Sequence, residues 1–240
     1  MLLPELRAAV ADANRAVAAS GLVLLSFGNV SGIDRDAGAM VIKASGFACA
    51  TLEPDQTVVV SLADGRVLEG PYRPSSDTPT HLVLYRRFTE LGGIVHTHSR
   101  HATAWAQAGA AIPCLGTTHA DYFHGPVPVT RPLLRDEIAG EYEANTGIAI
   151  VEAVEAAGSA TELPAVIVRS HGPFAWGRSP AAAAEHAAAL EIVAGMALDT
   201  AIVGTGSPAI DPALLERHFW RKHGPGATYG QPASSGGTRK

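Results

Sequence analysis

Short runs rich in β-branched residues recur along the chain, and the connection between two of them constrains the fold most. Ala63, Asp64 and Gly65 separate the run at residues 57–62 from the run at residues 67–69. A turn this short joins neighbouring strands as a hairpin, which pairs them antiparallel. Further strands are predicted at residues 22–30, 40–43, 93–99 and 165–170. Neither G-x-G-x-x-G nor G-x-x-x-x-G-K-[ST] occurs, so the sequence disfavours a Rossmann or P-loop nucleotide site.

Prolines in the first turn mark the predicted helices. Pro4 opens a segment whose apolar residues recur at helical spacing. Three later helices are predicted to begin with a capping residue followed by proline, at Thr78-Pro79, Ser179-Pro180 and Asp211-Pro212. Gly92 and Gly224 are predicted to end the first and the last of these. Residues 136–157 form one more helical pattern, in which Gly147 is the predicted break.

The composition favours one domain with a full hydrophobic core. Of the 240 residues, 47% are hydrophobic and 17% are charged, and the formal net charge is -5. This balance argues against a disordered chain and against a nucleic-acid-binding surface. We expect a single domain over residues 1–230 and a flexible polar tail over residues 231–240.

The sequence predicts a soluble protein of the reducing cytoplasm. No uninterrupted apolar run approaches the roughly 20 residues that span a bilayer, and the N-terminus does not resemble a signal peptide. Cys49 and Cys114 lie far apart without a partner motif. We therefore expect both to be buried, and expect neither a disulfide nor a thiolate metal site.

Three histidines are candidate metal ligands. His96 and His98 flank one residue in a predicted strand, so alternation places both imidazoles on the same face. Taken alone, the pair is as consistent with two hydrogen-bonded histidines as with a metal site. His171 follows the strand predicted at residues 165–170 and precedes Gly172-Pro173, a turn position where site residues are common. A third imidazole makes a His-rich divalent site plausible.

Asp77 is the candidate oxygen ligand. It stands directly before a predicted helix, where a turn or helix-capping role is the alternative. A carboxylate beside three imidazoles suits zinc, with manganese or cobalt as substitutes.

Several short segments could hold an anion such as a phosphate. They combine small residues with hydroxyl or amide groups, which lets backbone N–H groups approach an anion closely. The candidates are Gly28, Asn29, Ser45, Gly46, Ser75 and Ser76, with Lys43 as an added point charge. Each of these segments by itself is more consistent with an ordinary turn than with an anion site.

Seven segments together carry a resemblance to a known family. They are residues 28–31, 42–46, 74–81, 92–106, 116–123, 170–177 and 223–231. In these segments the chain resembles the class II aldolase/adducin family over nearly its whole length. The run at residues 116–123, GTTHADYF, is typical of the sugar-phosphate epimerases of that family rather than of the family at large.

The resemblance implies a fold, an assembly and a set of roles. The fold is a mostly antiparallel sheet flanked by helices, and the assembly is a homotetramer with active sites between subunits. The implied metal ligands are Asp77, His96, His98 and His171, and the implied acid/base residues are Asp121 and Tyr229. Substrate and phosphate contacts would fall to the anion-binding candidates named above. Phe27 and Ala44 depart from the family pattern, which more often has tryptophan and proline there.

The implied activity is the interconversion of L-ribulose 5-phosphate and D-xylulose 5-phosphate. The C4 hydrogen of such a ketose is not adjacent to its carbonyl, so enolisation cannot make it acidic. Cleavage of the C3–C4 bond and re-addition is the remaining route, and a divalent cation stabilises the enediolate charge. Each of two acid/base groups, one per face, typically contributes roughly 10²–10⁴-fold.

Two other functions remain open at this stage. A sugar-phosphate aldolase of the same family would release the cleaved aldehyde, although those enzymes commonly carry glutamate where this chain has Asp77. A non-catalytic adducin-like module would lack the ligand set. The same phosphoester occurs in arabinose and in ascorbate breakdown, and the sequence does not choose between these pathways.

Overall fold

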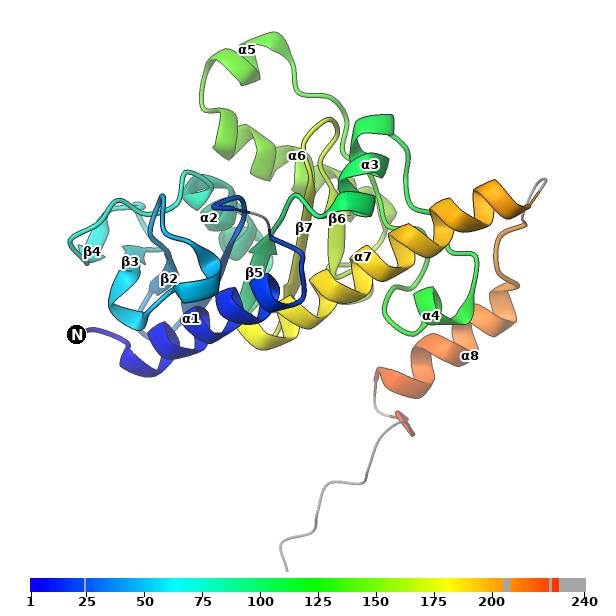
Figure 1. Cartoon of the computed structure of the whole chain (residues 1–240), viewed down its shortest axis with the longest axis horizontal. Helices are drawn as coiled ribbons and strands as arrows, with labels where there is room; N and C mark the ends of the chain where they lie inside the picture. Colours follow the sequence, from blue (N-terminus) through cyan, green and yellow to red (C-terminus); the bar gives the residue numbers. More distant parts are fainter. Residues whose placement is uncertain (24, 205–207, 225, 229–240) are drawn as a thin grey trace, which may run out of the picture.

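Seven strands and eight α-helices make up the described part of the chain in the computed structural model, which comprises residues 1–23, 25–204, 208–224 and 226–228 (Figure 1). In chain order the elements are α1 (Pro4–Ala19), β1 (Asn29–Asp34), β2 (Ala39–Lys43), η1 (Cys49–Thr51), η2 (Pro54–Gln56), β3 (Thr57–Ser61), β4 (Val67–Glu69), α2 (Thr78–Arg87), β5 (Gly93–His96), α3 (Arg100–Ala108), α4 (Thr117–Ala120), α5 (Arg135–Ala139), α6 (Tyr142–Ala157), β6 (Ala165–Ile167), β7 (Pro173–Gly177), α7 (Pro180–Val203) and α8 (Pro212–Lys222).

The strands form one sheet in the order β4-β3-β2-β1-β5-β7-β6, and every neighbouring pair is antiparallel. The predicted hairpin joins β3 to β4, and the antiparallel fold class is confirmed. Asn29 of β1 lies opposite His96 of β5, which in turn lies opposite Phe174 of β7. This register brings the ends of three strands together at one edge of the molecule.

Helices cover both faces of the sheet because strand side chains alternate between them. On one face, Ile42 and Phe174 pack in a cluster with Tyr85 of α2 and helix α6. On the other face, Val95 packs in a cluster with α7, and α1 lies beside α7 in Figure 1. The start of β1 meets the start of α2, where Asn29 donates a hydrogen bond to Asp77.

Several predicted boundaries are wrong. The first strand begins at residue 29 rather than 22, and residues 173–177 form β7, which was not predicted. The strand predicted at residues 93–99 ends at His96. Helix α2 ends at Arg87, before Gly92, because Phe88 turns back into the core and is only 7% exposed.

The predicted helix at residues 136–157 is two helices. The chain breaks at Gly140, between α5 and α6, whereas Gly147 lies inside α6. A Cβ at Gly147 would stand 2.8 Å from Cβ of Val83. This glycine therefore allows α6 to approach α2 closely rather than breaking the helix.

Helix α7 is long and apolar enough by length and composition to span a membrane, although Glu185, Glu191 and Asp199 interrupt its apolar residues. Its residues Ala183, Leu190 and Val193 are buried in the core against the sheet. We interpret α7 as a core helix. Cys49 and Cys114 are buried and unpaired, as predicted.

Candidate metal centre and substrate cavity

The three predicted histidines converge where the central strand β5 ends, beside the turn between β6 and β7. One ring nitrogen from each of His96, His98 and His171 lies within 4.8 Å of the other two. The ring centroids are 4.9 Å apart for His96–His98, 4.9 Å for His96–His171 and 5.0 Å for His98–His171. The cluster is therefore a nearly equilateral triangle of imidazoles.

The sheet and one tight turn position these rings. His96 ends β5, and His98 follows two residues later, just beyond the strand. His171 lies in the turn between β6 and β7, next to Ser170, whose φ of 61° is in the left-handed region that L-residues seldom adopt. Such strain is common where a chain must place a functional side chain.

Gly28 permits the close approach of the strand opposite. Its φ is +90°, and a Cβ there would stand 2.6 Å from the carbonyl oxygen of His96. Only glycine fits this position, so the residue keeps β1 tight against β5 beside the histidines.

Asp77 faces the histidines and does not cap its helix. It is the N-cap residue of α2, yet its carboxylate accepts no hydrogen bond from the helix backbone. Instead, Nδ2 of Asn29 donates to Oδ2 of Asp77 over 2.6 Å and to Oγ of Ser75 over 3.1 Å. The alternative role as a helix cap is therefore not the one that this side chain performs.

The electrostatics prepare these groups for a cation. Burial lowers the pKa of His96 to about 3, and burial also lowers the pKa values of His98 and His171. The imidazoles are thus neutral near pH 7, with lone pairs available. Burial alone would raise the pKa of Asp77, but its electrostatic interactions with the neighbouring His96 and His81 and the hydrogen bond from Asn29 hold it below its usual value. The carboxylate is therefore ionised.

A divalent cation fits this donor set. The Nε2 atoms of His96 and His98 are 3.1 Å apart, close to the roughly 3.4 Å expected between two nitrogens that share a tetrahedral ion at about 2.0–2.1 Å. Nδ1 of His96 lies 3.0 Å from the carbonyl oxygen of Pro173. Protonated there, the ring presents the lone pair of Nε2 to the cluster, which is the usual outer contact of a metal-binding histidine.

The predicted anion-binding residues line the same cavity as the histidines. This cavity has a volume of about 470 Å³. Its lining includes Gly28, Asn29, Lys43, Ser45, Gly46, Ser75, Ser76, Asp77, His96, His98 and His171. The residues predicted to bind an anion and those predicted to bind a metal therefore share one cavity.

Lys43 is held more tightly than a solvent-exposed cation would be. The residue is 2% exposed, and its Nζ donates to the carbonyl oxygen of Phe47 over 2.7 Å. Burial lowers its pKa, while the nearby Asp77 opposes that shift. Lys43 is therefore fixed in place on the cavity wall by a backbone contact.

Asp121, one of the two predicted acid/base residues, lies away from the histidine cavity. Asp121 follows α4 and accepts hydrogen bonds from His218 over 3.0 Å and from Arg221 over 2.8 Å, both in α8. Burial would raise its pKa, but Arg221 and His218 hold it below the usual value. Asp121 is not among the residues that line the histidine cavity. Tyr229 and the predicted tail at residues 231–240 lie outside the described residues.

The sequence did not indicate Tyr142 and Glu143, which also line the cavity. Both lie in the first turn of α6, inside a segment that was predicted to be helical from residue 136 with its break at Gly147. Because the chain changes direction at Gly140, the first turn of α6 lies beside the histidine cavity. Gly140 was the available signal in the sequence, but the predicted break was placed at Gly147 instead.

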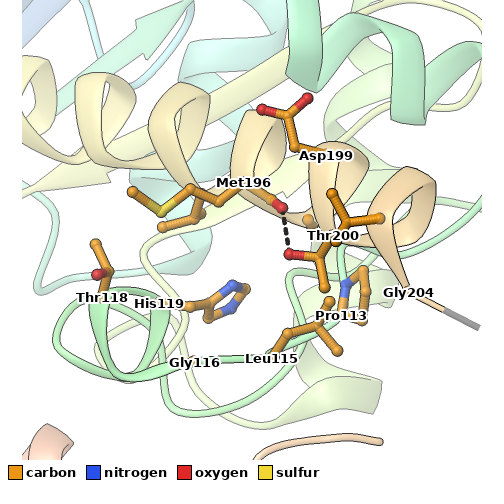
Figure 2. Close-up of a pocket in the computed structure, with 12 residues that line it drawn as sticks. Pro113, Leu115, Gly116, Thr118, His119, Met196, Asp199, Thr200 and Gly204 are labelled. Carbon is orange, nitrogen blue, oxygen red and sulfur yellow. Dashed lines mark hydrogen bonds between the residues drawn. The ribbon is translucent and has the colours of Figure 1, made fainter. Parts of the chain in front are cut away.

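A second cavity, of about 570 Å³, lies between the C-terminal half of α7 and residues 113–119. Figure 2 shows Met196, Leu115 and Pro113 around it, with Thr200 donating a hydrogen bond to the backbone of Met196. Its lining is mainly apolar and holds none of the residues of the histidine cluster. The polar cavity around the histidines is therefore the candidate site.

Fold and site together define a class of protein: an antiparallel sheet covered by helices, with a candidate metal site of three imidazoles where β5 and the turn before β7 meet. Residues 8–198 match the family described as Class II Aldolase and Adducin N-terminal domain. The chain belongs to the class II aldolase and adducin family.

The chain is also similar to relatives that are named for one particular activity. The chain is 53% identical over 231 residues to L-ribulose-5-phosphate 4-epimerase UlaF of Salmonella paratyphi A, covering 95% of this chain and 100% of that protein. The protein of the same name from Salmonella typhi matches equally. The expected family membership is confirmed.

Solved structures agree on the fold. The chain superposes on an L-fuculose 1-phosphate aldolase with a TM-score of 0.78 at 21% identity, covering 92% of this chain and 97% of that one. The L-fuculose-1-phosphate aldolase of Thermus thermophilus gives a TM-score of 0.64 at 27% identity, covering 85% of this chain and 98% of that one.

Proposed function

We propose that this protein is an epimerase that interconverts L-ribulose 5-phosphate and D-xylulose 5-phosphate. Identity of 53% across the whole length of a relative named for this activity carries the proposal. The cavity supports it, because a candidate metal site and candidate phosphate-binding groups share one continuous space of about 470 Å³. That volume suits a small phosphorylated sugar.

Asp77, His96, His98 and His171 would hold the cation, which we propose is zinc, with manganese or cobalt as substitutes. When bound, it supplies Lewis-acid stabilisation of negative charge on the substrate's C2 and C3 oxygens. The lowered pKa values of the histidines keep these ligands deprotonated at neutral pH.

The cavity wall must hold the phosphate while the substrate is in two pieces. Breaking the C3–C4 bond moves its electrons to the carbonyl side and leaves an aldehyde that carries the phosphate. Ser45, Ser75 and Ser76 offer hydroxyl donors, Gly46 and Ser76 offer backbone N–H donors, and Lys43 offers a charge. With its phosphate gripped, the aldehyde can turn and present its other face, and re-formation of the bond inverts C4.

Two proton-transfer groups are required, because the C4 hydroxyl lies on opposite sides before and after the reaction. We assign these roles to Asp121 and Tyr229. Since Asp121 does not line the histidine cavity of its own chain, we propose that it serves the cavity of a neighbouring subunit in a homotetramer. Its low pKa makes it a proton acceptor at neutral pH.

The surface around α4 supports this assembly. Thr118 and His119 of α4 line the apolar cavity in Figure 2, and Asp121 follows directly at the end of the same helix. Met196 and Val203 on the neighbouring part of α7 are 50% and 87% exposed. Apolar surface next to a proposed catalytic residue is what a subunit contact would cover.

We further propose that residues 1–230 act as a single domain and that the enzyme works in the cytoplasm. Its partners would be a phosphorylated sugar and copies of itself, with no nucleic acid or membrane.

Incubation with L-ribulose 5-phosphate and assay of D-xylulose 5-phosphate tests the activity. We expect steady conversion that stops on chelation and returns with zinc, manganese or cobalt. Accumulation of glycolaldehyde phosphate would instead identify a sugar-phosphate aldolase. A chain that forms neither D-xylulose 5-phosphate nor glycolaldehyde phosphate, and that binds no divalent ion, would fit a non-catalytic adducin-like module.

A further inference from the structure

Each histidine that binds a metal through one ring nitrogen needs a partner for the proton on the other. His96 has one in the carbonyl oxygen of Pro173, 3.0 Å from its Nδ1. A backbone carbonyl can only accept, so it fixes the tautomer of His96 without the help of any side chain. The question is what fixes the tautomer of His171, which lies in a turn rather than in a strand.

The hydroxyl of Tyr142 occupies that position. It lies 3.2 Å from Nδ1 of His171, and the two rings stack with centroids 6.3 Å apart and an interplanar angle of 25°. Within the described part of the chain, no other hydrogen bond reaches the His171 imidazole. The orientation of this ring therefore depends on a single side chain from another element.

Tyr142 is itself held rigidly relative to the rest of the cluster. It is the first residue of α6, and Oγ1 of Thr80 in α2 donates to the carbonyl oxygen of the next residue, Glu143, over 2.6 Å. Oγ1 of Thr146 donates to the carbonyl oxygen of Tyr142 over 2.9 Å. The first turns of α2 and α6 are thus tied together, one directly preceded by Asp77 and the other beginning at Tyr142.

We propose that Tyr142 is a positioning residue for the metal centre: its hydroxyl oxygen accepts the Nδ1–H of His171, so that Nε2 of His171 presents its lone pair to His96 and His98. The hydroxyl hydrogen of Tyr142 is then directed away from His171, and Tyr142 lines the cavity where an oxygen of the substrate could accept it. This inference rests on the proposed metal-dependent function and adds a residue to its site.

The Tyr142→Phe variant tests the contact, because it keeps the ring and its stacking and removes only the hydroxyl. Titration of metal-free full-length enzyme with Co²⁺, followed by its visible absorption, measures the affinity without turnover. We expect the dissociation constant to rise about 10–100-fold, as is typical when a supporting partner of a ligand is lost. Tyr72→Phe is the matched control, since this tyrosine packs on Phe47 away from the histidines and should leave the affinity unchanged.

A second measurement reads the tautomer directly. Long-range ¹H–¹⁵N spectra of the metal-free wild-type enzyme should show His171 with its proton on Nδ1, and the Tyr142→Phe spectrum should show a mixture with the Nε2–H form. A wild-type His171 protonated on Nε2, or an unchanged Co²⁺ affinity in Tyr142→Phe, would overturn the role of Tyr142. A wild-type enzyme that binds no Co²⁺ would instead refute the proposed metal-dependent function, and the spectra would still decide the tautomer.

Discussion

Asp77 and Asp211 both directly precede a helix, but their carboxylates make different hydrogen bonds. Each is the N-cap residue of a helix with proline in its first turn. Oδ1 of Asp211 accepts a hydrogen bond from the backbone N–H of Ala213 over 2.8 Å, as a helix cap does. The carboxylate of Asp77 makes no such bond and receives one from Asn29 instead. Residue type and helix position alone could not separate these two roles.

This difference predicts opposite consequences of substitution. Asp77→Asn keeps the shape of the side chain and an oxygen for Asn29, but it removes the negative charge beside the histidines. We expect metal affinity to fall by more than the 10–100-fold that is typical of a group that only supports a ligand. We expect the midpoint of thermal unfolding of the metal-free protein to change little, because no helix cap is lost.

Asp211→Ala is the matched comparison. It removes a capping bond, so the free energy of unfolding should fall by about 1 kcal/mol, with metal content unchanged. Elemental analysis and thermal unfolding of both variants measure the two effects. If Asp77→Asn retained full metal affinity, Asp77 could not be a ligand.

At the scale of elements, the packing of α6 on α2 depends on Gly147. A Cβ added there would stand 2.8 Å from Cβ and 3.0 Å from Cγ1 of Val83. Alanine is the better helix former by about 1 kcal/mol, so an isolated helix would gain from the change. Here the close contact opposes it, and overpacking of a core contact typically costs about 1–3 kcal/mol.

We therefore expect Gly147→Ala to lower the free energy of unfolding rather than raise it. The double variant with Val83→Ala should recover part of the loss, because the smaller side chain makes room for the new methyl group. Urea unfolding of the wild type, both single variants and the double variant gives the coupling between the two positions. Additive effects would mean that the two residues do not oppose each other in the core.

The elements also show how far the sequence could predict this fold and its site. Short turns and X-Pro helix starts located the hairpin and the starts of α2, α7 and α8 correctly, because these signals are local. β7 was missed because Pro173 and the glycines around it read as a turn, and its strand character comes from pairing with β5 and β6. The histidines and Asp77 were found by residue type and spacing, whereas Tyr142 depends on the contact between α2 and α6, which is not local.

At the scale of the whole molecule, buried neutral histidines make stability depend on pH. Burial lowers the pKa values of His81 and His119 to about 4 in the folded protein, against about 6.5 for an unfolded chain. Between these values the unfolded chain binds more protons than the folded one, so the free energy of unfolding falls as pH falls. Each histidine contributes up to about 1.4 kcal/mol per pH unit in this window and nothing above it.

His119→Gln tests this dependence. Nε2 of His119 lies 2.8 Å from the carbonyl oxygen of Gly125, and glutamine can replace that donor without titrating. Urea unfolding of metal-free protein between about pH 7.5 and about pH 4.5 should give a shallower loss of stability for the variant, by up to about 1.4 kcal/mol per pH unit. Identical slopes would show that His119 is protonated equally in both states.

The separation of Asp121 from the histidines predicts that active sites are shared between subunits. Within one chain Asp121 is bound by His218 and Arg221 of α8, and it does not line the cavity that holds His96. His96→Ala and Tyr229→Phe should each be nearly inactive alone. If the histidine cluster comes from one subunit and Asp121 and Tyr229 from its neighbour, random co-assembly joins intact halves at about a quarter of the interfaces.

Mixing the two variants should therefore recover up to about a quarter of wild-type activity after subunit exchange, by the same counting. The recovery should be absent when the variants are assayed together without exchange, which controls for residual activity of either one. A further control mixes wild type with a double variant that carries both changes in one chain. Because this double variant contributes no intact half to any interface, the control distinguishes shared sites from stabilisation of one chain by its neighbour. A lack of recovery after demonstrated exchange would mean that each chain completes its own site, and that the segment of α4 and Asp121 must then move to reach the histidines of the same chain.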